Sequence, residues 1–472
     1  MSPSAEVRTV IEGCAVATVD AAGTEYADGH VVLRGSRIEA VGEGPAPAAG
    51  DGVPERRVDA RGCLVTPALV NAHHHLFQWT TRGLAQEANL PGWLGALYPI
   101  WALVDEEGER IAARAGLAAL LRSGCGTTTD HHYIFPRDGG DLLAAEIEVA
   151  QELGVRFHPC RGSIDRGRSQ GGWPPDHVVE DRDTILAASE AAIDRWHDPS
   201  PDAMLQIALG PCSPHSLTRE LVVESIALAR RRGVRLHTHL AVTREEEAHC
   251  LAQYGCRPVD YASRLGLIGD DVWFAHGVHL DEDERRLLAQ TGTGVAHCPS
   301  SNGRLGDGIA PVAGLLRVGA PVGLGVDGAA SNEDAELRTE MRLALLYARL
   351  RDGAAALSAR QALALGTIGG ARCLGRGAEL GSLEPGKLAD VAVWRVDETG
   401  QAGIDDPVWT LVFGPRPQVR LLLVNGRAVV EDGELRTAAE DQIAADAVRA
   451  SRQLRARAAE LASHDVGQSS HP

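Results

Sequence analysis

The sequence contains almost no lysine: Lys387 is the only one among 472 residues. Acidic residues outnumber basic ones, and the net charge is −18 at neutral pH. Such a chain repels the phosphate backbones of nucleic acids, so we expect no nucleic-acid partner. Hydrophobic residues (44%) and charged residues (23%) occur at ordinary globular fractions, which excludes disorder, collagen and coiled coil for most of the chain.

Long apolar runs and paired cysteine motifs are also missing. No stretch approaches the ~18 apolar residues of a transmembrane helix, and the first residues lack the basic start and apolar stretch of a secretory signal. The nine cysteines are odd in number and form no C-x-x-C motif, which indicates reduced thiols. We therefore predict a cytoplasmic protein with no membrane partner.

The middle of the chain alternates short apolar runs with longer helical segments. Runs such as VRLHTHL and VWFAHGVHL are typical of strands, whereas EDERRLLAQTG has helical periodicity and ends at glycine. Repeated strand–helix units indicate a parallel sheet of the α/β class. Residues 66–377 are long enough for a (β/α)8 TIM-type barrel of ~250 residues with insertions, and we predict that fold.

The two ends of the chain share a different texture. Val- and Ile-rich runs separated by turn residues occupy residues 1–65 and return in residues 378–435. We predict that these two segments together form one small composite β-sandwich domain. Residues 436–472 are predicted to form a C-terminal helix and a tail.

Two histidine pairs lie at the ends of predicted strands. In His73-x-His75 and His237-x-His239 the two side chains of a pair point in the same direction, because side chains alternate along a strand. Neutral imidazoles are the commonest metal ligands in proteins. In the second pair, one histidine could complete a triad of imidazoles and the other could support it. Each pair alone could equally be a polar surface turn.

Two further polar residues follow apolar strands. His276 could act as a base or orient a water molecule, or it could be a satisfied core histidine. Asp327 could bind a metal and accept a proton from water, or it could be a helix cap or turn residue. Taken together, three imidazoles and one carboxylate at successive strand ends predict a cation site with room for a water molecule. The cation would lower the pKa of that water towards ~7 and supply hydroxide.

With these motifs the chain resembles the amidohydrolase superfamily, in its branch of mononuclear aminohydrolases. The resemblance reaches the chain ends through residues 383–390 (LEPGKLAD) and 424–426 (VNG). Within the branch, residues 73–83 (HHHLFQWTTRG), 297–302 (HCPSSN) and 327–334 (DGAASNED) are similar to 8-oxoguanine deaminases. Triazine hydrolases share much of this pattern.

The resemblance implies a role for each polar residue at the strand ends. His73, His75, His239 and Asp327 would hold one divalent metal ion, Zn²⁺ in the first place and Fe²⁺ as the alternative. His276 would hydrogen-bond the attacking hydroxide. Asp327 would deprotonate the water and pass its proton towards the leaving amine. No lysine stands at a strand end to be carboxylated, so a two-metal site is disfavoured.

The resemblance also points to substrate contacts. Gln78 stands where guanine deaminases place a glutamine against the purine edge, and Arg82 could hold a ring carbonyl oxygen. Trp93 and Cys212 are expected to line the pocket. Gln78 and Arg82 could instead be solvated residues on a helix surface.

One position departs from the family pattern. The family normally reads His-Leu-x-Glu after the fifth strand, and that glutamate protonates a ring nitrogen of the substrate. Residues 239–242 read HLAV here, so Val242 stands where the acid belongs. Glu245, Glu246 and Glu247 follow, but they are typical of the solvated start of a helix. Another acid could substitute, the substrate could need no ring protonation, or turnover could be weak or lost.

We predict a hydrolase that acts on C–N bonds other than peptide bonds and deaminates a purine-like heterocycle. The first candidate reaction converts 8-oxoguanine to urate plus ammonia, slowed by the loss of the acid at Val242. A triazine or pterin aminohydrolase is the enzymatic alternative, and a non-catalytic descendant that keeps the metal and binds a heterocycle is the other. The expected partners are the small-molecule heterocycle and further copies of the chain in a homo-oligomer.

Overall fold

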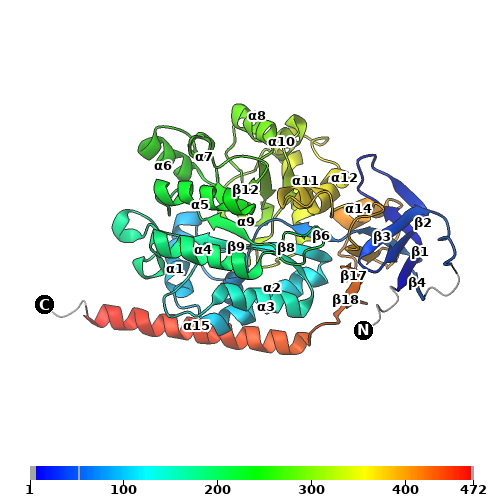
Figure 1. The fold of residues 1–472 in the computed structure, drawn as a ribbon, viewed down its shortest axis with the longest axis horizontal. Coiled ribbons are helices and arrows are strands. Elements are labelled where there is room, and N and C mark those ends of the chain that lie inside the picture. Colours follow the sequence, from blue (N-terminus) through cyan, green and yellow to red (C-terminus); the bar gives the residue numbers. More distant parts are fainter. Residues whose placement is uncertain (1–6, 51–53, 469–472) are drawn as a thin grey trace.

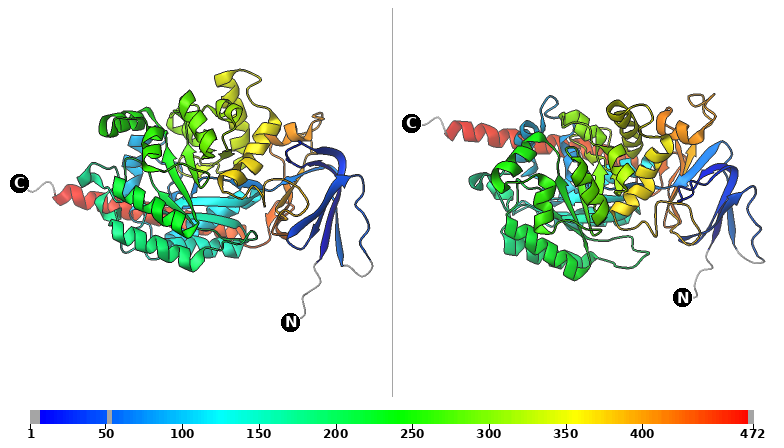
Figure 2. Two further views of the ribbon diagram at one scale, coloured as in Figure 1. Left: turned by 45° about the horizontal axis from the view of Figure 1, so that its top comes forward. Right: turned by 90° about the horizontal axis from the view of Figure 1, so that it is seen from above.

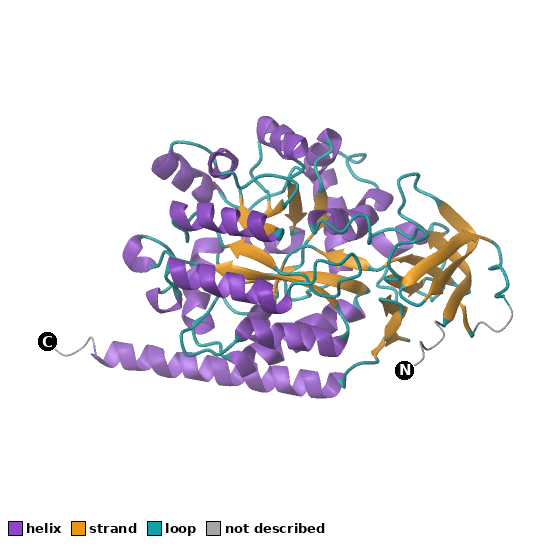
Figure 3. Ribbon diagram, in the orientation of Figure 1, coloured by secondary structure: helices purple, strands orange, loops and turns teal. Residues whose placement is uncertain are grey.

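The centre of the protein is a closed barrel of parallel strands surrounded by helices (Figures 1 and 3). The structure is a computed structural model that describes residues 7–50 and 54–468. The barrel strands are β6 (Leu69–Asn71), β8 (Cys125–His132), β9 (Arg156–Ser163), β10 (Ala208–Pro211), β11 (Arg235–Leu240), β12 (Val272–His276), β13 (Gly294–His297) and β14 (Val322–Leu324). The predicted TIM-type barrel is confirmed. Its strands are almost wholly buried, which is why they read as continuous apolar runs.

Helices follow the strands and cover the outside of the barrel. They are α1 (Leu90–Trp101), α2 (Glu106–Arg122), α3 (Leu142–Leu153), α4 (Arg182–Trp196), α5 (Arg219–Arg232), α6 (Arg244–Tyr254), α7 (Pro258–Leu265), α8 (Glu282–Thr291), α9 (Pro299–Leu305), α10 (Val312–Val318), α11 (Leu337–Asp352), α12 (Ala359–Ala364) and α13 (Gly370–Cys373). Short 3₁₀ turns are η1 (Leu76–Thr81), η2 (Arg168–Gln170) and η3 (Asp176–Val178), and η4 (Leu365–Gly369) is a π-helical turn. The helix boundaries follow local chemistry: the side chain of Asp105 caps the start of α2, and Gly154 ends α3 in the left-handed conformation.

The two ends of the chain meet in one nine-stranded sheet beside the barrel (Figure 1). Its strands are β1 (Arg8–Ala17), β2 (Glu25–Arg34), β3 (Arg37–Glu43), β4 (Glu55–Asp59), β5 (Cys63–Pro67), β16 (Val391–Arg395), β17 (Val419–Val424), β18 (Arg427–Glu431) and β19 (Glu434–Leu435). The antiparallel pairing of β5 with β16 joins the N-terminal strands to the C-terminal ones in a single hydrogen-bonded path. Ile11, Val65 and Val393 are buried in a core that belongs to this sheet alone.

Three smaller elements complete the fold. β7 (His74–His75) pairs with β15 (Asp327–Gly328) in a two-stranded sheet, and α14 (Pro407–Phe413) packs against α11 and α12. Helix α15 (Glu440–Gln468) runs along the outside of the barrel and contacts α2, η1 and α1 (Figures 1 and 2). All nine cysteines are buried free thiols. Among the described residues, no helix is both long and apolar enough to span a membrane.

A buried ion pair connects the barrel to the small sheet. The guanidinium of Arg156 in β9 donates two hydrogen bonds to the carboxylate of Asp390, at 2.9 and 3.0 Å, and a third to the carbonyl of Ala203 at 2.6 Å. Asp390 Oδ1 also accepts the backbone N–H of Asn425 at 2.7 Å, and its carbonyl accepts the N–H of Ala68. Arg156 is completely buried, so its charge depends on this carboxylate.

Removing the carboxylate should therefore destabilise the whole chain. Breaking a buried pair leaves an uncompensated charge and costs about 3–5 kcal/mol. We expect Asp390→Ala to lower the free energy of unfolding, measured by urea denaturation, by that amount. Asp59→Ala is the control, because Asp59 pairs with Arg61 at the surface, where it is 56% exposed. Equal stability of the two variants would contradict a role for the buried pair.

Candidate active site

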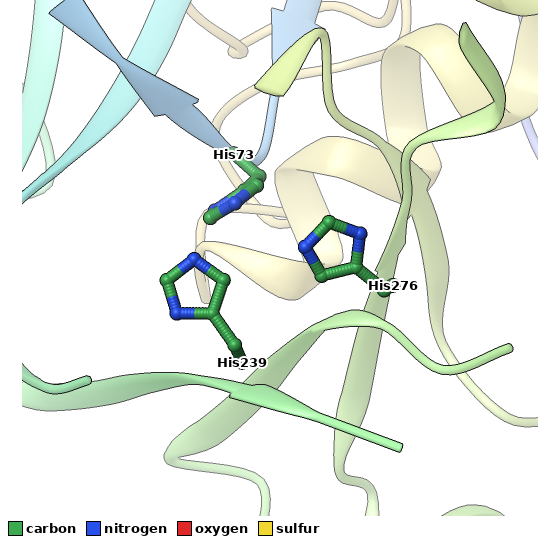
Figure 4. Close-up of side chains that lie close together, drawn as sticks. All are labelled: His73, His239 and His276. Atoms are coloured by element: carbon green, nitrogen blue, oxygen red, sulfur yellow. The ribbon is translucent and has the colours of Figure 1, made fainter. Parts of the chain in front are cut away.

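Three imidazoles and one carboxylate meet at one end of the barrel. The Nε2 atoms of His73 and His75 each lie 3.3 Å from Asp327 Oδ1, and the Nε2 atoms of His75 and His239 lie 3.0 Å apart. His73 and His75 follow β6, His239 lies in β11 and Asp327 begins β15, so residues far apart in sequence share one point. Figure 4 shows the rings of His73, His239 and His276 turned towards one another.

Backbone carbonyls fix which nitrogen of each ring carries the proton. His75 Nδ1 lies 2.8 Å from the carbonyl oxygen of His131, and His239 Nδ1 lies 2.8 Å from that of Cys212. A carbonyl oxygen can only accept, so each Nδ1 carries the hydrogen and donates it. The Nε2 atoms of His75 and His239 then carry no hydrogen, and their lone pairs face each other.

For His73, a hydrogen bond to a second histidine, His237, determines which ring nitrogen carries the proton. His237 Nδ1 donates to the carbonyl of Trp273 at 2.9 Å, which leaves His237 Nε2 as an acceptor. That atom lies 2.8 Å from His73 Nδ1, which therefore donates to it. His73 Nε2 has no hydrogen-bond partner among the described residues. Of the pair at 237 and 239, His239 thus faces the other imidazoles and His237 orients His73.

Burial keeps these rings neutral. It lowers the pKa of His75 to about 3 and that of His239 to about 4, and it holds the pKa of His73 well below its ordinary value. Burial alone would raise the pKa of Asp327, but the imidazoles around it outweigh burial, and the pKa lies well below the usual range. At neutral pH the site therefore presents three neutral nitrogen donors and one carboxylate.

This donor set fits a divalent metal ion. Lone pairs that face one another at 3.0–3.3 Å repel unless a cation lies among them. Ligand bonds of about 2.0–2.2 Å at tetrahedral angles place neighbouring donors about 3.3–3.6 Å apart, close to the separations found here. Each nitrogen ligand is oriented by a hydrogen bond from its other ring nitrogen, as in known metal sites.

His276 lies at the edge of this cluster, with a ring nitrogen within 4.8 Å of those of His73 and His239. Its Nδ1 lies 2.9 Å from Asn302 Oδ1, and its Nε2 lies 3.9 Å from Asp327 Oδ2. The latter gap is too long for a direct hydrogen bond and leaves both atoms free to contact a water molecule. His276 (φ 75°) and Asp327 (φ 60°) both adopt left-handed backbone conformations, which are strained for residues with a Cβ and typical of functional sites.

A cavity opens directly above these residues. It encloses about 730 Å³ of space not filled by atoms, its mouth included, and its floor contains His75, His239, His276 and Asp327. Its walls are largely aromatic and aliphatic, and they are formed by Leu90, Trp93, Leu94, Tyr98, Tyr133, Trp173 and Leu305. A largely apolar, aromatic-walled cavity with a polar floor is suited to an aromatic heterocycle.

Three of the four predicted substrate contacts line the cavity. Gln78 lies in η1, and its Oε1 atom is buried without a partner among the described residues. Gly328 permits this close approach, because a Cβ there would lie 1.8 Å from that oxygen. Trp93 anchors its ring by donating from Nε1 to the carbonyl of Ala330 at 3.2 Å. Burial raises the pKa of Cys212 to about 12, so it contributes a neutral thiol.

The fourth predicted contact, Arg82, lies elsewhere. It follows η1, its guanidinium sits 4.2 Å from the ring centroid of Trp79, and it donates to the carbonyl of Glu333. It lines a separate surface hollow beside α15, next to Arg455. The 3₁₀ turn ends at Thr81, so the chain carries Arg82 away from the cavity. The structure therefore gives Arg82 no contact with a ring in the cavity.

Val242 faces the cavity, and two acids lie near it. Glu246 is buried, not solvated as its place at a helix start indicated, and its carboxylate accepts the N–H groups of Ala241 (2.9 Å) and Val242 (2.7 Å). Burial raises its pKa to about 7 although these bonds favour the charged form. Both carboxylate oxygens thus stabilise the turn that leads into α6 by accepting hydrogen bonds from its backbone.

The second acid, Asp307, was not among the residues predicted from the sequence. It lines the same cavity, and its Oδ2 is buried without a hydrogen-bond partner among the described residues. Burial, followed by the charges of Asp327, Glu245 and Glu246, raises its pKa to about 7. The sequence shows only an aspartate shortly after residues 297–302. Its place in the cavity wall could not be predicted, because that place depends on the turn that ends α9.

Comparison with known proteins places the chain among metal-dependent hydrolases. It is 43% identical to 8-oxoguanine deaminase of Pseudomonas aeruginosa over 89% of this chain and 93% of that protein. It is 39% identical to an isoxanthopterin deaminase from an unknown prokaryotic organism, over 89% of this chain and 90% of that one. The crystal structure of atrazine chlorohydrolase from Arthrobacter aurescens TC1, complexed with zinc, superposes with a TM-score of 0.88 at 33% identity and covers 94% of this chain and 100% of that one.

These relatives are similar over nearly their whole length, and the three Nε2 donors and the carboxylate stand at the strand ends of the same barrel fold. Residues 64–429 match the amidohydrolase family. The chain belongs to the amidohydrolase family and is a hydrolase that acts on C–N bonds.

Proposed function

We propose that the protein is a zinc-dependent deaminase that converts 8-oxoguanine to urate and ammonia. The observation that carries this proposal is the group of three bare Nε2 atoms and one carboxylate beneath an aromatic-walled cavity. The similarity over 89% of the chain to an 8-oxoguanine deaminase supports the choice of substrate. Cytoplasmic location and assembly into a homo-oligomer stay predictions from the sequence.

The residues of the floor have separate tasks. His73, His75, His239 and Asp327 would hold the ion, which when bound lowers the pKa of a coordinated water towards ~7. His276 Nε2 and Asp327 Oδ2, 3.9 Å apart, would orient the attacking oxygen between them. That oxygen forms a bond to the carbon that carries the amino group. Asp327 accepts one proton of the water and delivers it to the amine, which leaves as ammonia. The second water proton, released as the carbonyl forms, replaces the proton that the ring nitrogen receives from the acid.

A second proton is needed at the ring nitrogen next to the attacked carbon. Addition to this carbon places an electron pair on that nitrogen, and a positioned acid that neutralises it contributes typically ~10²–10⁴-fold. Val242 has no proton to give. We assign this task to Asp307, because its Oδ2 is unpartnered within the described cavity wall and its raised pKa, about 7, keeps it partly protonated at neutral pH. Glu246 is less suited, because two backbone N–H groups hold its carboxylate.

A pterin is the second candidate substrate. The isoxanthopterin deaminase that is 39% identical to this chain favours it, and a pterin is a flat bicycle like a purine. The two candidates are separated by comparing ammonia release from 8-oxoguanine and from isoxanthopterin at equal protein concentration. A higher kcat/KM for isoxanthopterin would make the pterin the proposed substrate in place of 8-oxoguanine, and the assignment as a deaminase would stand.

The metal assignment predicts a specific loss. His73→Ala together with His75→Ala should remove one divalent ion per chain from the purified protein, as counted by elemental analysis, because two of the four ligands are lost. His177→Ala is the matched control, since His177 lies at the surface. Unchanged metal content in the double variant would overturn the ligand assignment.

Gln78 should matter for ring binding. A buried group that loses its hydrogen-bond partner costs about 1–3 kcal/mol, so Gln78→Ala should weaken 8-oxoguanine affinity about tenfold or more. The change should raise the dissociation constant measured by calorimetry. Gln86→Ala serves as the control, because Gln86 is exposed and bonds only the nearby carbonyl of Gly83. Equal affinities of both variants would show that Gln78 does not contact the ring.

The acid assignment predicts a rate loss and a change in pH profile. Asp307→Asn should lower kcat for ammonia release by about 10²-fold or more, while Glu246→Gln changes it far less. Because the acid form of Asp307 is lost as pH rises through about 7, wild-type kcat should fall above that pH, and the asparagine variant should lack this fall.

A rescue experiment tests the same point from the other side. Val242→Glu in the Asp307→Asn background restores a carboxyl at the family position and should recover at least about tenfold in kcat, the low side of the general-acid range. If Asp307→Asn retains full kcat and the wild-type pH profile, another residue donates the proton.

A further inference from the structure

A second cluster of ionisable side chains lies on the outer side of the barrel wall, away from the cavity. Its members are Glu109 of α2, Asp130 and His132 of β8, and Glu146 of α3, and each of them is 0% exposed. Side chains alternate along β8, so Asp130 and His132 point to the helices while His131 points into the barrel. The cluster is sealed between the strand and the two helices that pack on it.

Most polar atoms of this cluster have no hydrogen-bond partner among the described residues. No N–H or hydroxyl group of a described residue reaches the carboxylate oxygens of Glu109 and Glu146, Asp130 Oδ2 or His132 Nδ1. The carboxyl groups of Asp130 and Glu146 are close enough to share a hydrogen bond if one of them holds a proton. His132 Nε2 lies 2.9 Å from the carbonyl of Ile134 and therefore carries the ring hydrogen. His132 Nδ1 is thus a bare lone pair that faces the carboxyl groups. Buried polar groups are nearly always satisfied, so this concentration requires an explanation.

The separations fit ligands that share a cation. His132 Nδ1 lies 3.8 Å from Glu109 Oε1 and 3.8 Å from Glu146 Oε2. That is too long for a hydrogen bond. Two ligands bound at about 2.1 Å to one ion lie about 3.4–3.8 Å apart when the angle between them is about 110–130°. The ligating atoms of all three residues lie within 4.8 Å of one another.

The charge balance also requires a cation or protons. Burial lowers the pKa of His132 to about 3, so its ring is neutral and offers no countercharge to the carboxylates. Burial raises the pKa of Glu109 and Glu146 well above the ordinary value and that of Asp130 to about 7. The cluster therefore either retains protons on these carboxyls or binds a divalent ion that neutralises two of them.

We propose that Glu109, His132 and Glu146, with Asp130 beside them, form a second divalent metal site, structural and of the zinc class. An imidazole combined with carboxylates suits Zn²⁺, and complete burial leaves no open position for a substrate. A proton shared between Asp130 and Glu146 leaves the lone pair of His132 Nδ1 facing Glu109 at 3.8 Å without a hydrogen bond, whereas a bound ion would satisfy both.

The proposed ion would also steady the active site. Asp130 Oδ1 accepts the N–H of Leu76 at 2.6 Å, and Leu76 directly follows the ligand His75. The neighbouring residue on β8, His131, offers its carbonyl to His75 Nδ1 at 2.8 Å. The same strand thus orients a ligand of the catalytic ion with one residue and holds the structural ion with the residues on either side.

Counting ions tests the proposal in the full chain. Wild-type protein expressed with zinc should contain about two ions per chain by elemental analysis. Glu109→Gln with Glu146→Gln, which keeps size and removes charge, should contain one. Glu148→Gln is the matched control on α3, because that side chain is 41% exposed and pairs with Arg110. Its zinc content should equal that of wild type.

Two further measurements keep the test decisive if the double variant does not fold. Chelation of wild-type protein by EDTA should remove one ion quickly from the cavity and the other only at the rate of global unfolding, because the second site has no exposed atom to attack. Crystals of wild type should show an anomalous zinc peak between β8, α2 and α3. One ion per chain, a single chelation phase and no such peak would overturn the proposal and leave a proton-sharing cluster. The variant that lacks His73 and His75 should still retain the ion at this second site, so the two metal assignments fail independently.

Discussion

The active site depends on one constraint: each histidine ligand must carry its proton on Nδ1. A parallel barrel satisfies this constraint with its own backbone, because the strand or loop beside each ligand offers a carbonyl to Nδ1. His75 uses the carbonyl of His131 and His239 uses that of Cys212, whereas His73 reaches the backbone of Trp273 only through His237. The order of the strands therefore determines the tautomers, and the tautomers create a point where three lone pairs meet.

The backbone at the active site adopts strained conformations. His276, Asp327 and Ala241 all have positive φ angles at the ends of strands, where most side chains would avoid them. The turn at Ala241 brings the next side chain, that of Val242, to the cavity, whereas His276 and Asp327 are each followed by a glycine. The surrounding close packing, including the pairing of β15 with β7, keeps these residues in place.

The sequence predicts those features of the site that depend on local spacing. Alternation along a strand places His73 with His75, and position at a strand end marks His276, Asp327 and the pair at 237 and 239 as candidates. The family resemblance then selects His239 from that pair. Features that depend on how a turn leaves the barrel could not be predicted. The end of η1 carries Arg82 away from the cavity, a capping contact buries Glu246, and the turn after α9 places Asp307 in the wall. The cluster around His132 was equally hidden, because its members come from three elements that only tertiary packing brings together.

Desolvation acts in opposite directions on the two kinds of group that this chemistry requires. It lowers the pKa of the imidazoles, to about 3 for His75 and about 4 for His239, so they stay neutral and able to bind metal well below neutral pH. It raises the pKa of Asp307 to about 7, so that a carboxyl in the same cavity can still donate a proton. Asp327 escapes this effect only because the imidazoles around it favour its charged form. A single largely apolar cavity thus holds neutral imidazoles, one carboxylate and one carboxyl of raised pKa side by side, and under the proposed function that carboxyl replaces the acid missing at Val242.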